Sequence, residues 1–261
     1  MKPSFLQYEK PLLTVMIQTP NPDHAVQRIR KSLAAGGDAF GLQMESFPPE
    51  YHNDDFYRSL IAEMQGRPVY VTNYRSGKNK GRTDEDLAEE LLHMADLGGT
   101  LFDVMNDYFD PTPGEFSENP VAVEKQKKLI SDLHAKGAEV LMSCHVLKFI
   151  PAEEVLKIAL AQQERGADIV KIVTGANSEE EEMENLRIAA LLGKELSVPF
   201  ILLAAGTHAK ILRMIGPCFG CFGVFAVYEH DSNAVLTQPT VAAARAVLDH
   251  FDYLPDLAVL P

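Results

Sequence analysis

The chain has 261 residues, of which 46% are hydrophobic, and its formal net charge is −13. Its length and even composition fit one large α/β domain over residues 1–261, because single barrels commonly reach this size. The negative charge argues against nucleic acid or an anionic membrane surface as a partner.

Eight short apolar runs follow one another along the chain, at residues 12–17, 39–44, 68–72, 100–105, 139–143, 169–173, 199–204 and 218–226. Each run is followed by a segment with the periodicity of an amphipathic helix. Runs that are apolar on both faces are typical of parallel strands covered by helices, so the pattern predicts an α/β fold, the (β/α)8 TIM barrel. A doubly wound open sheet is the alternative, but its G-x-G-x-x-G and P-loop signatures are absent.

Lys171 is unusual because it lies inside the apolar run Ile169–Val173. Burial disfavours the charged form of a lysine, and the neutral amine is the nucleophile of Schiff-base enzymes. One run earlier, Ser143-Cys144-His145 ends in a histidine that can move protons. Together the two side chains predict imine chemistry. The alternative is a lysine paired with a carboxylate inside the barrel.

We expect neither a metal nor a cofactor. The histidines show no paired ligand spacing such as H-E-x-x-H. Cys218 and Cys221 lie three residues apart in the last apolar run, where strand alternation would point them to opposite faces. A shared metal ion is therefore not predicted for this pair.

At this point the chain resembles the type I 3-dehydroquinate dehydratases of the shikimate pathway, which serves aromatic amino acid biosynthesis. The resemblance extends from Leu13 to about Leu248 and marks the chain as a divergent member of this class of Schiff-base barrels. Its strongest elements are the Ser-x-His of residues 143–145, the Gly-Ala-Asp-Ile-x-Lys-Ile of residues 166–172, and Arg213 within residues 209–216.

The resemblance implies a cofactor-free carbon–oxygen lyase that converts 3-dehydroquinate to 3-dehydroshikimate and water. Lys171 would form the imine with the substrate ketone, and His145 would be the general base and acid. Arg213 would bind the substrate carboxylate, a bidentate role suited to guanidinium. Arg75 and Gln238 would line the site, with Gln238 on a mobile loop.

Several positions depart from the family pattern. The glutamate of strand four that orients the histidine corresponds to Met105 here, and the glutamate and arginine of strand two that bind substrate hydroxyls correspond to Gly41 and Gln43. Gln43 is therefore the residue expected to face the substrate from that strand. Asp103 shares the inward face with Met105, and Asp107 follows at the strand end, so either is a candidate for the missing carboxylate.

The resemblance also bears on the lid of the site. The family's lid serine corresponds to Ser232, which lies two residues farther from Gln238 than the family motif has it. The implied partner is a small anionic keto acid, and the resemblance further implies a homodimer. The longest apolar stretch, residues 198–206, is too short to cross a bilayer and no signal-like segment opens the sequence, so we expect a cytoplasmic protein.

Two other functions stay open. A class I aldolase-like imine enzyme could act on another keto acid or on a sugar phosphate, because Gly206 and Gly220 fall where barrels often bind phosphate. A barrel without its histidine-orienting glutamate could instead bind a carboxylate without catalysis. Turnover of a panel of keto acids and sugar phosphates would distinguish the dehydratase from the aldolase-like enzyme, and the absence of any turnover would indicate the binding protein.

Overall fold

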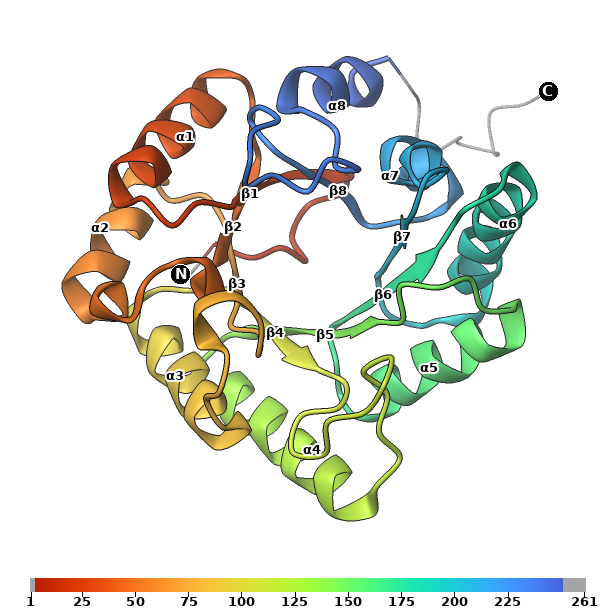
Figure 1. Cartoon of the computed structure of the whole chain (residues 1–261), viewed down its shortest axis with the longest axis horizontal. Coiled ribbons are helices and arrows are strands. Elements are labelled where there is room, and N and C mark those ends of the chain that lie inside the picture. Colours follow the sequence, from red (N-terminus) through yellow and green to blue (C-terminus); the bar gives the residue numbers. More distant parts are fainter. Residues whose placement is uncertain (1–2, 251–261) are drawn as a thin grey trace.

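The structure, a computed structural model, describes residues 3–250, in which strands and helices alternate along the chain (Figure 1). The strands are β1 (Leu12–Ile17), β2 (Ala39–Gln43), β3 (Val69–Thr72), β4 (Leu101–Met105), β5 (Glu139–His145), β6 (Ile169–Gly175), β7 (Phe200–Ala205) and β8 (Gly223–Ala226). The helices are α1 (Pro22–Ala34), α2 (Asp54–Glu63), α3 (Asp84–Leu97), α4 (Pro120–Ala135), α5 (Ala152–Glu164), α6 (Glu179–Glu195), α7 (Lys210–Ile215) and α8 (Val241–Leu248).

The strands form one ring surrounded by the helices, which confirms the predicted (β/α)8 barrel (Figure 1). Each strand from β1 to β6 pairs in parallel with the next one in the chain, and β8 pairs in parallel with β1. Between β7 and β8, the backbone N–H of Phe222 donates to the carbonyl of Phe200 over 2.8 Å. The carboxyl ends of all the strands thus meet at one rim of the barrel.

Local sequence signals set where the helices begin and end. At the start of α3, Thr83 and Asp86 form a capping box, in which each side chain accepts a hydrogen bond from the other residue's backbone N–H. The same helix ends at Gly98, whose φ of 118° is a left-handed conformation that glycine adopts at little cost. These local signals define where α3 begins and ends without the help of tertiary contacts.

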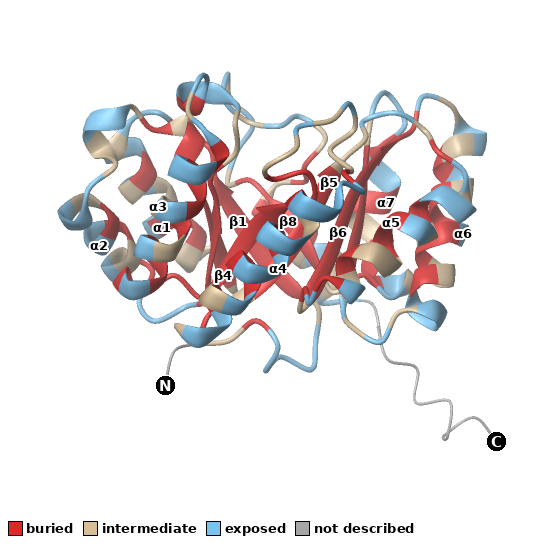
Figure 2. Cartoon of the chain, turned by 90° about the horizontal axis from the view of Figure 1, so that it is seen from below, coloured by how far each residue is buried: buried red, intermediate tan, exposed pale blue. Residues whose placement is uncertain are grey.

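The strands are buried, whereas the helices bury one face and expose the other (Figure 2). Side chains from several strands fill the interior of the barrel, among them Met16, Tyr70 and Phe225. The rings of Tyr70 and Phe225 stack with their centroids 5.4 Å apart. Because the interior is packed rather than open, a ligand can enter only from the rim where the strands end.

The last apolar run differs from its prediction. The strand in this region is only Gly223–Ala226, and Cys218 lies in the 3-10 helix η4 (Gly216–Phe219), exposed to solvent. Gly220 ends this helix with a φ of 99°. The prediction that Cys218 and Cys221 lie in one strand was therefore wrong, because a turn separates this part of the run from β8.

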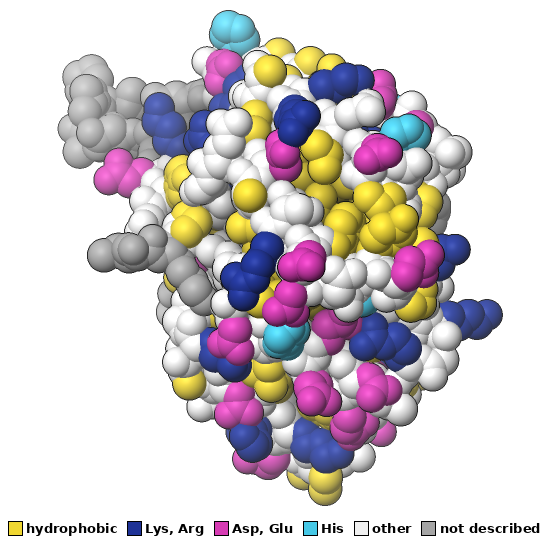
Figure 3. Space-filling view, turned by 90° about the vertical axis from the view of Figure 1, so that its left-hand side faces the viewer, with side chains coloured by type: hydrophobic (Ala, Val, Ile, Leu, Met, Phe, Trp, Pro, Cys, Tyr) yellow, Lys and Arg dark blue, Asp and Glu magenta, His cyan; other side chains and the backbone are white. Residues whose placement is uncertain are grey.

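The face of the molecule that carries α1, α2 and α3 shows basic and acidic side chains intermingled (Figure 3). On it, Arg30 of α1 and Glu63 of α2 form an ion pair of 2.6 Å, and His93 of α3 lies 2.6 Å from Asp54 of α2. Such exposed pairs contribute little stability each. None of the helices in the described part of the chain is long and apolar enough to span a membrane.

Candidate active site

Lys171 lies in the middle of β6 with its side chain inside the barrel, and only 4% of the residue is exposed. Its Nζ is 2.7 Å from the hydroxyl of Tyr74, 3.1 Å from the hydroxyl of Tyr70 and 3.3 Å from Oδ2 of Asp103. It also lies over the aromatic rings of both tyrosines. The amine therefore sits in a small polar cluster enclosed by aromatic rings.

Asp103 is the centre of this cluster. Ser143 donates to its Oδ1 over 2.5 Å, and the hydroxyls of Tyr70 and Tyr74 both donate to its Oδ2. Burial and the charge of Asp103 raise the pKa of both phenols well above the ordinary value, so both tyrosines keep their protons and act as donors. The resting structure therefore has Lys171 paired with a carboxylate, as the alternative to imine chemistry supposed.

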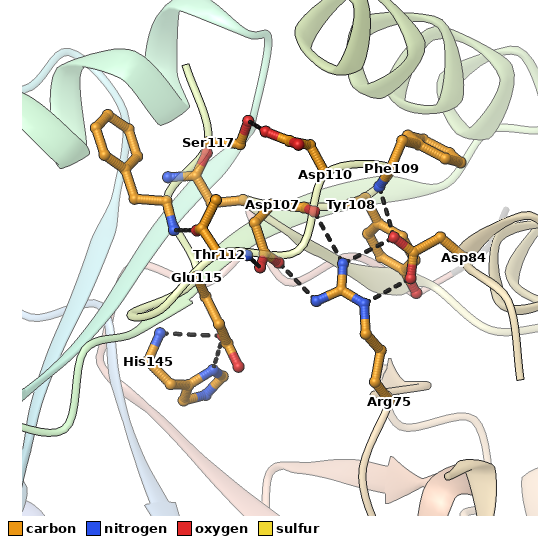
Figure 4. Close-up of polar contacts among 12 residues, drawn as sticks. Arg75, Asp84, Asp107, Tyr108, Phe109, Asp110, Thr112, Glu115, Ser117 and His145 are labelled. Atoms are coloured by element: carbon orange, nitrogen blue, oxygen red, sulfur yellow. Dashed lines mark hydrogen bonds and ion pairs between the residues drawn. The ribbon is translucent and has the colours of Figure 1, made fainter. Parts of the chain in front are cut away.

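His145 is the last residue of β5, one strand from Lys171. Its Nδ1 is 2.6 Å from Oε2 of Glu115, and its backbone N–H donates to the same oxygen over 3.1 Å (Figure 4). The ring of Tyr74 meets the imidazole edge-on, with the centroids 5.2 Å apart. Tyr74 thus touches both residues that the sequence assigns to catalysis.

Neither aspartate proposed as a substitute for the family glutamate fills that place. Asp103 binds Lys171, and Asp107 binds Arg75 over 2.8 Å. The carboxylate at His145 comes instead from Glu115 in the loop after β4. Nothing in the sequence pattern marked this residue, because it lies in an irregular loop rather than on a strand.

Arg75 borders the site, but its guanidinium is occupied. Its Nε and Nη2 donate to Asp84 over 2.6 and 2.8 Å, and its Nη1 donates to Asp107 (Figure 4). The guanidinium also lies over the ring of Tyr108. Such a doubly paired arginine has little freedom to bind a substrate anion.

A cavity of about 420 Å³ opens at the rim above these residues. Its walls include Tyr74, Arg75, Met105, Glu115 and His145. Since Tyr74 lines the cavity and hydrogen-bonds to Nζ of Lys171, its phenol lies between this cavity and the amine.

Arg213 of α7 is 6% exposed and reaches the end of β7, where its Nε donates to the carbonyl of Ala204 over 2.8 Å. Burial lowers the pKa of its guanidinium to about 10, against the opposing charge of Glu182. The side chain therefore carries its positive charge at neutral pH. In the described part of the chain, its Nη atoms have no hydrogen-bond partner, which leaves them available to an anion.

The residues predicted for the lid are held differently from one another. Gln238 is buried, and its Oε1 accepts a hydrogen bond from Nε2 of Gln18 over 3.2 Å, at the carboxyl end of β1. Gln18 in turn accepts from the backbone N–H of Val235 over 2.9 Å. Ser232 is exposed on the same loop. The structure thus places Gln238 at the rim and Ser232 at the surface.

The inner face of β2 carries no charge where the family pattern has charged groups. Any Cβ at Gly41 would collide with Sδ of Met16 and lie 3.3 Å from the ring of Tyr70. Gln43 ends the strand half-buried. Glu45, just beyond it, is buried, accepts hydrogen bonds from Thr72 and has a pKa raised by desolvation to about 7. The carboxylate nearest to the end of β2 is therefore engaged with β3.

Comparisons with known proteins show the family to which the chain belongs. The family model for type I 3-dehydroquinase matches residues 13–255. The chain is 32% identical to the 3-dehydroquinate dehydratase of Klebsiella pneumoniae strain 342 over 223 residues. This aligned region covers 82% of this chain and 83% of the relative.

Two further matches are weaker in extent or identity. The chain is 33% identical to the 3-dehydroquinate dehydratase of Alkaliphilus oremlandii over 108 residues, which span 41% of this chain and only 42% of that relative. A crystal structure of type I 3-dehydroquinate dehydratase from Clostridium difficile, with covalently modified comenic acid, superimposes with a TM-score of 0.77 at 20% identity. It covers 93% of this chain and 92% of its own, and at this identity the likeness speaks for the fold alone.

Proposed function

We propose that this chain, which belongs to the type I 3-dehydroquinate dehydratase family and is a carbon–oxygen lyase, removes water from 3-dehydroquinate through an imine on Lys171. The observation that carries the proposal is the placement of Nζ of Lys171 inside the barrel, one strand from His145. The buried charge of Arg213 at the neighbouring strand end supports a carboxylated substrate.

Imine formation begins with loss of a proton from the Lys171 ammonium. Asp103 is the nearest carboxylate, at 3.3 Å from Nζ, and accepts this proton. The free amine attacks the ketone carbon of the substrate, and the ketone oxygen leaves as water after it has been protonated. The resulting iminium withdraws electrons from the adjacent carbon, which makes a proton on that carbon easier to remove.

Elimination then uses His145 twice. Its imidazole removes the proton next to the iminium, and the electron pair forms an enamine. The imidazolium returns that proton to the hydroxyl group on the next carbon, which departs as water while the double bond of the product forms. Water finally hydrolyses the imine, which releases the product and restores the Lys171 amine.

Arg213 would hold the substrate carboxylate during these steps. With a pKa of about 10 it stays charged at neutral pH, and its buried position strengthens its attraction for an anion. Its Nε is fixed by the carbonyl of Ala204, so the remaining nitrogens have a defined direction. A planar guanidinium in such a position suits two parallel hydrogen bonds to a carboxylate.

A second candidate is the same imine chemistry on a keto acid with fewer hydroxyl groups. The inner face of β2 favours it, because Met16 occupies the space above Gly41 and Gln43 is uncharged. Such an uncharged wall offers a substrate hydroxyl group no charge-assisted hydrogen bond, which a glutamate or an arginine would supply. Depletion of a panel of keto acids, with 3-dehydroquinate and sugar phosphates included, would rank these substrates by kcat/KM.

The imine itself is testable by reductive trapping. Incubation with 3-dehydroquinate and borohydride should add to the intact protein the mass of one ligand less one oxygen atom, because the imine forms with loss of water and is reduced by two hydrogens; an adduct trapped after elimination lacks one further water. The adduct should lie on the peptide that contains Lys171. Lys171→Met is the control and should show no adduct while it melts as a folded protein. A well-folded wild-type protein without an adduct would argue for another keto acid, and an absence of adducts across the panel would favour a barrel that binds carboxylates without catalysis.

A further inference from the structure

The loop between β4 and α4, residues 106–119, brings a carboxylate to His145 that β4 itself does not supply. Met105, at the end of β4, offers a thioether to the cavity. Oε2 of Glu115 accepts from both Nδ1 and the backbone N–H of His145 (Figure 4). Because an ionised carboxylate only accepts hydrogen bonds, Nδ1 carries the proton and Nε2 is left as the base.

The loop holds Glu115 in a conformation that needs support. The φ of Glu115 is 56°, in a region that residues with a Cβ seldom adopt and that persists only where surrounding contacts enforce it. Its backbone N–H donates to the carbonyl of Thr112 over 3.1 Å, and Oγ1 of Thr112 accepts from the N–H of Phe116 over 3.0 Å. Sγ of Cys144 lies 2.9 Å from the carbonyl of Gly114. Contacts on both sides of Glu115 therefore define its direction.

Arg75 belongs to this support. It binds Asp107, whose other oxygen accepts from the backbone N–H of Thr112 over 2.8 Å (Figure 4). On the far side of the loop, the buried Arg165 donates to the carbonyl of Ser117 over 2.6 Å. A chain of hydrogen bonds thus connects Arg75 through Asp107 and Thr112 to the turn that presents Glu115.

We propose that Glu115 is the positioning residue for His145, and that Arg75 acts by holding the loop that presents Glu115 rather than by binding substrate. The inference rests on the proposed function for the catalytic role of His145. The orientation of the imidazole, however, is measurable without turnover. The failure of one proposal is therefore distinguishable from the failure of the other.

The first experiment is NMR of protein labelled with ¹⁵N in its histidines, with His145 assigned through His145→Gln. In the wild type, the neutral imidazole should carry its proton on Nδ1. Glu115→Gln should shift the population toward the form protonated on Nε2. Glu118→Gln, a neutralised glutamate on the exposed part of the same loop, is the matched control and should leave the His145 signals in place.

The second experiment is steady-state kinetics on the same variants. Glu115→Gln should lower kcat about 100-fold with little change in KM, as expected for a group that orients a base. Glu115→Asp should retain part of the activity, and adding Met105→Glu to Glu115→Gln should restore part of it, because residue 105 borders the same cavity. Arg75→Met should lower kcat while KM stays near the wild-type value, whereas loss of a substrate ligand would raise KM.

Three results would decide the roles of Glu115 and Arg75. An unchanged tautomer and an unchanged kcat in folded Glu115→Gln would overturn the positioning role. A large rise in KM in Arg75→Met would return Arg75 to the substrate. A shifted tautomer in Glu115→Gln, in a protein whose wild type forms no borohydride adduct, would support the positioning role and reject the proposed reaction. Thermal melts of Glu115→Gln and Glu115→Asp establish that the variants compared are folded.

Discussion

Lys171 and Asp103 illustrate how a residue that is costly to bury becomes tolerable. Taking a charge out of water is expensive unless it is paired and hydrogen-bonded. Here the carboxylate of Asp103 accepts from Ser143 and two phenols as well as facing Nζ. The same set of contacts keeps the amine next to a group that can take its proton.

A substitution at Asp103 tests this account of the buried pair. Asp103→Asn should lower the free energy of unfolding by about 3–5 kcal/mol, because it leaves the Lys171 ammonium buried without a counter-ion. The double variant Asp103→Asn with Lys171→Met should recover most of this loss, since no unpaired charge is left inside the barrel. Urea unfolding at pH 7 measures both. Equal stability of Asp103→Asn and the wild type would mean that the pair is not ionic.

Sequence patterns predicted the strands of the barrel but not the contacts of the loop that follows β4. The run at residues 12–17 coincides with β1, because a strand that is apolar on both faces is stable in a parallel sheet covered by helices. Lys171 was selected as a candidate by its position within such a run, and His145 by its position just after one. The position of Glu115 depends instead on a positive φ and on the bonds of Thr112, for which a single sequence has no periodic signal.

The contacts of Arg75 were harder to predict than its location. Arg75 lies at the rim as expected, but Asp84, which binds it, comes from the first turn of α3. Asp84 is the first residue of α3, where a carboxylate also complements the helix dipole, so its position alone indicates no contact with Arg75. A contact between residues of two different local motifs, such as Arg75 after β3 and Asp84 at the start of α3, is therefore what the sequence alone does not show.

The turn after β2 carries a prediction about pH. Glu45, in the 3-10 helix η1 (Met44–Ser46), has a pKa raised by desolvation from 4.5 to about 7. The native state therefore binds a proton between these values that the unfolded chain releases, and stability falls as pH rises through this window, by up to about 3 kcal/mol. In Glu45→Gln this loss should be absent.

The measurement compares urea unfolding of Glu45→Gln and the wild type at pH 5 and pH 8. The advantage of the variant should be small at pH 5 and larger at pH 8, while contributions from all other groups cancel in the difference. Glu50→Gln, an exposed neighbour, should show no such trend. A pH-independent difference for Glu45→Gln would show that the native carboxyl titrates near its ordinary value.

Hydrogen bonds between neighbouring strands are unevenly distributed around the barrel. Parallel ladders link β1 through β7 and join β8 to β1 in the part of the chain that the structure describes. Between β7 and β8 the hydrogen bond from Phe222 to Phe200 precedes the short strand β8. We call this junction between β7 and β8 the seam. Local opening occurs most readily where contacts are fewest, so we expect the barrel to open at the seam without unfolding completely.

Hydrogen exchange in dilute urea tests this opening. The amide of Phe222, bonded over 2.8 Å to Phe200, is matched by the amide of Glu139, bonded over 2.8 Å to Thr100 between β4 and β5. We expect the Phe222 amide to exchange at least about tenfold faster after correction for intrinsic rates, which corresponds to about 1.4 kcal/mol less opening free energy. Equal protection of the two amides would mean that the ring opens only as a whole. Faster exchange at Phe222 would instead identify the seam as the place where the barrel first separates, on the side of the molecule that carries Arg213.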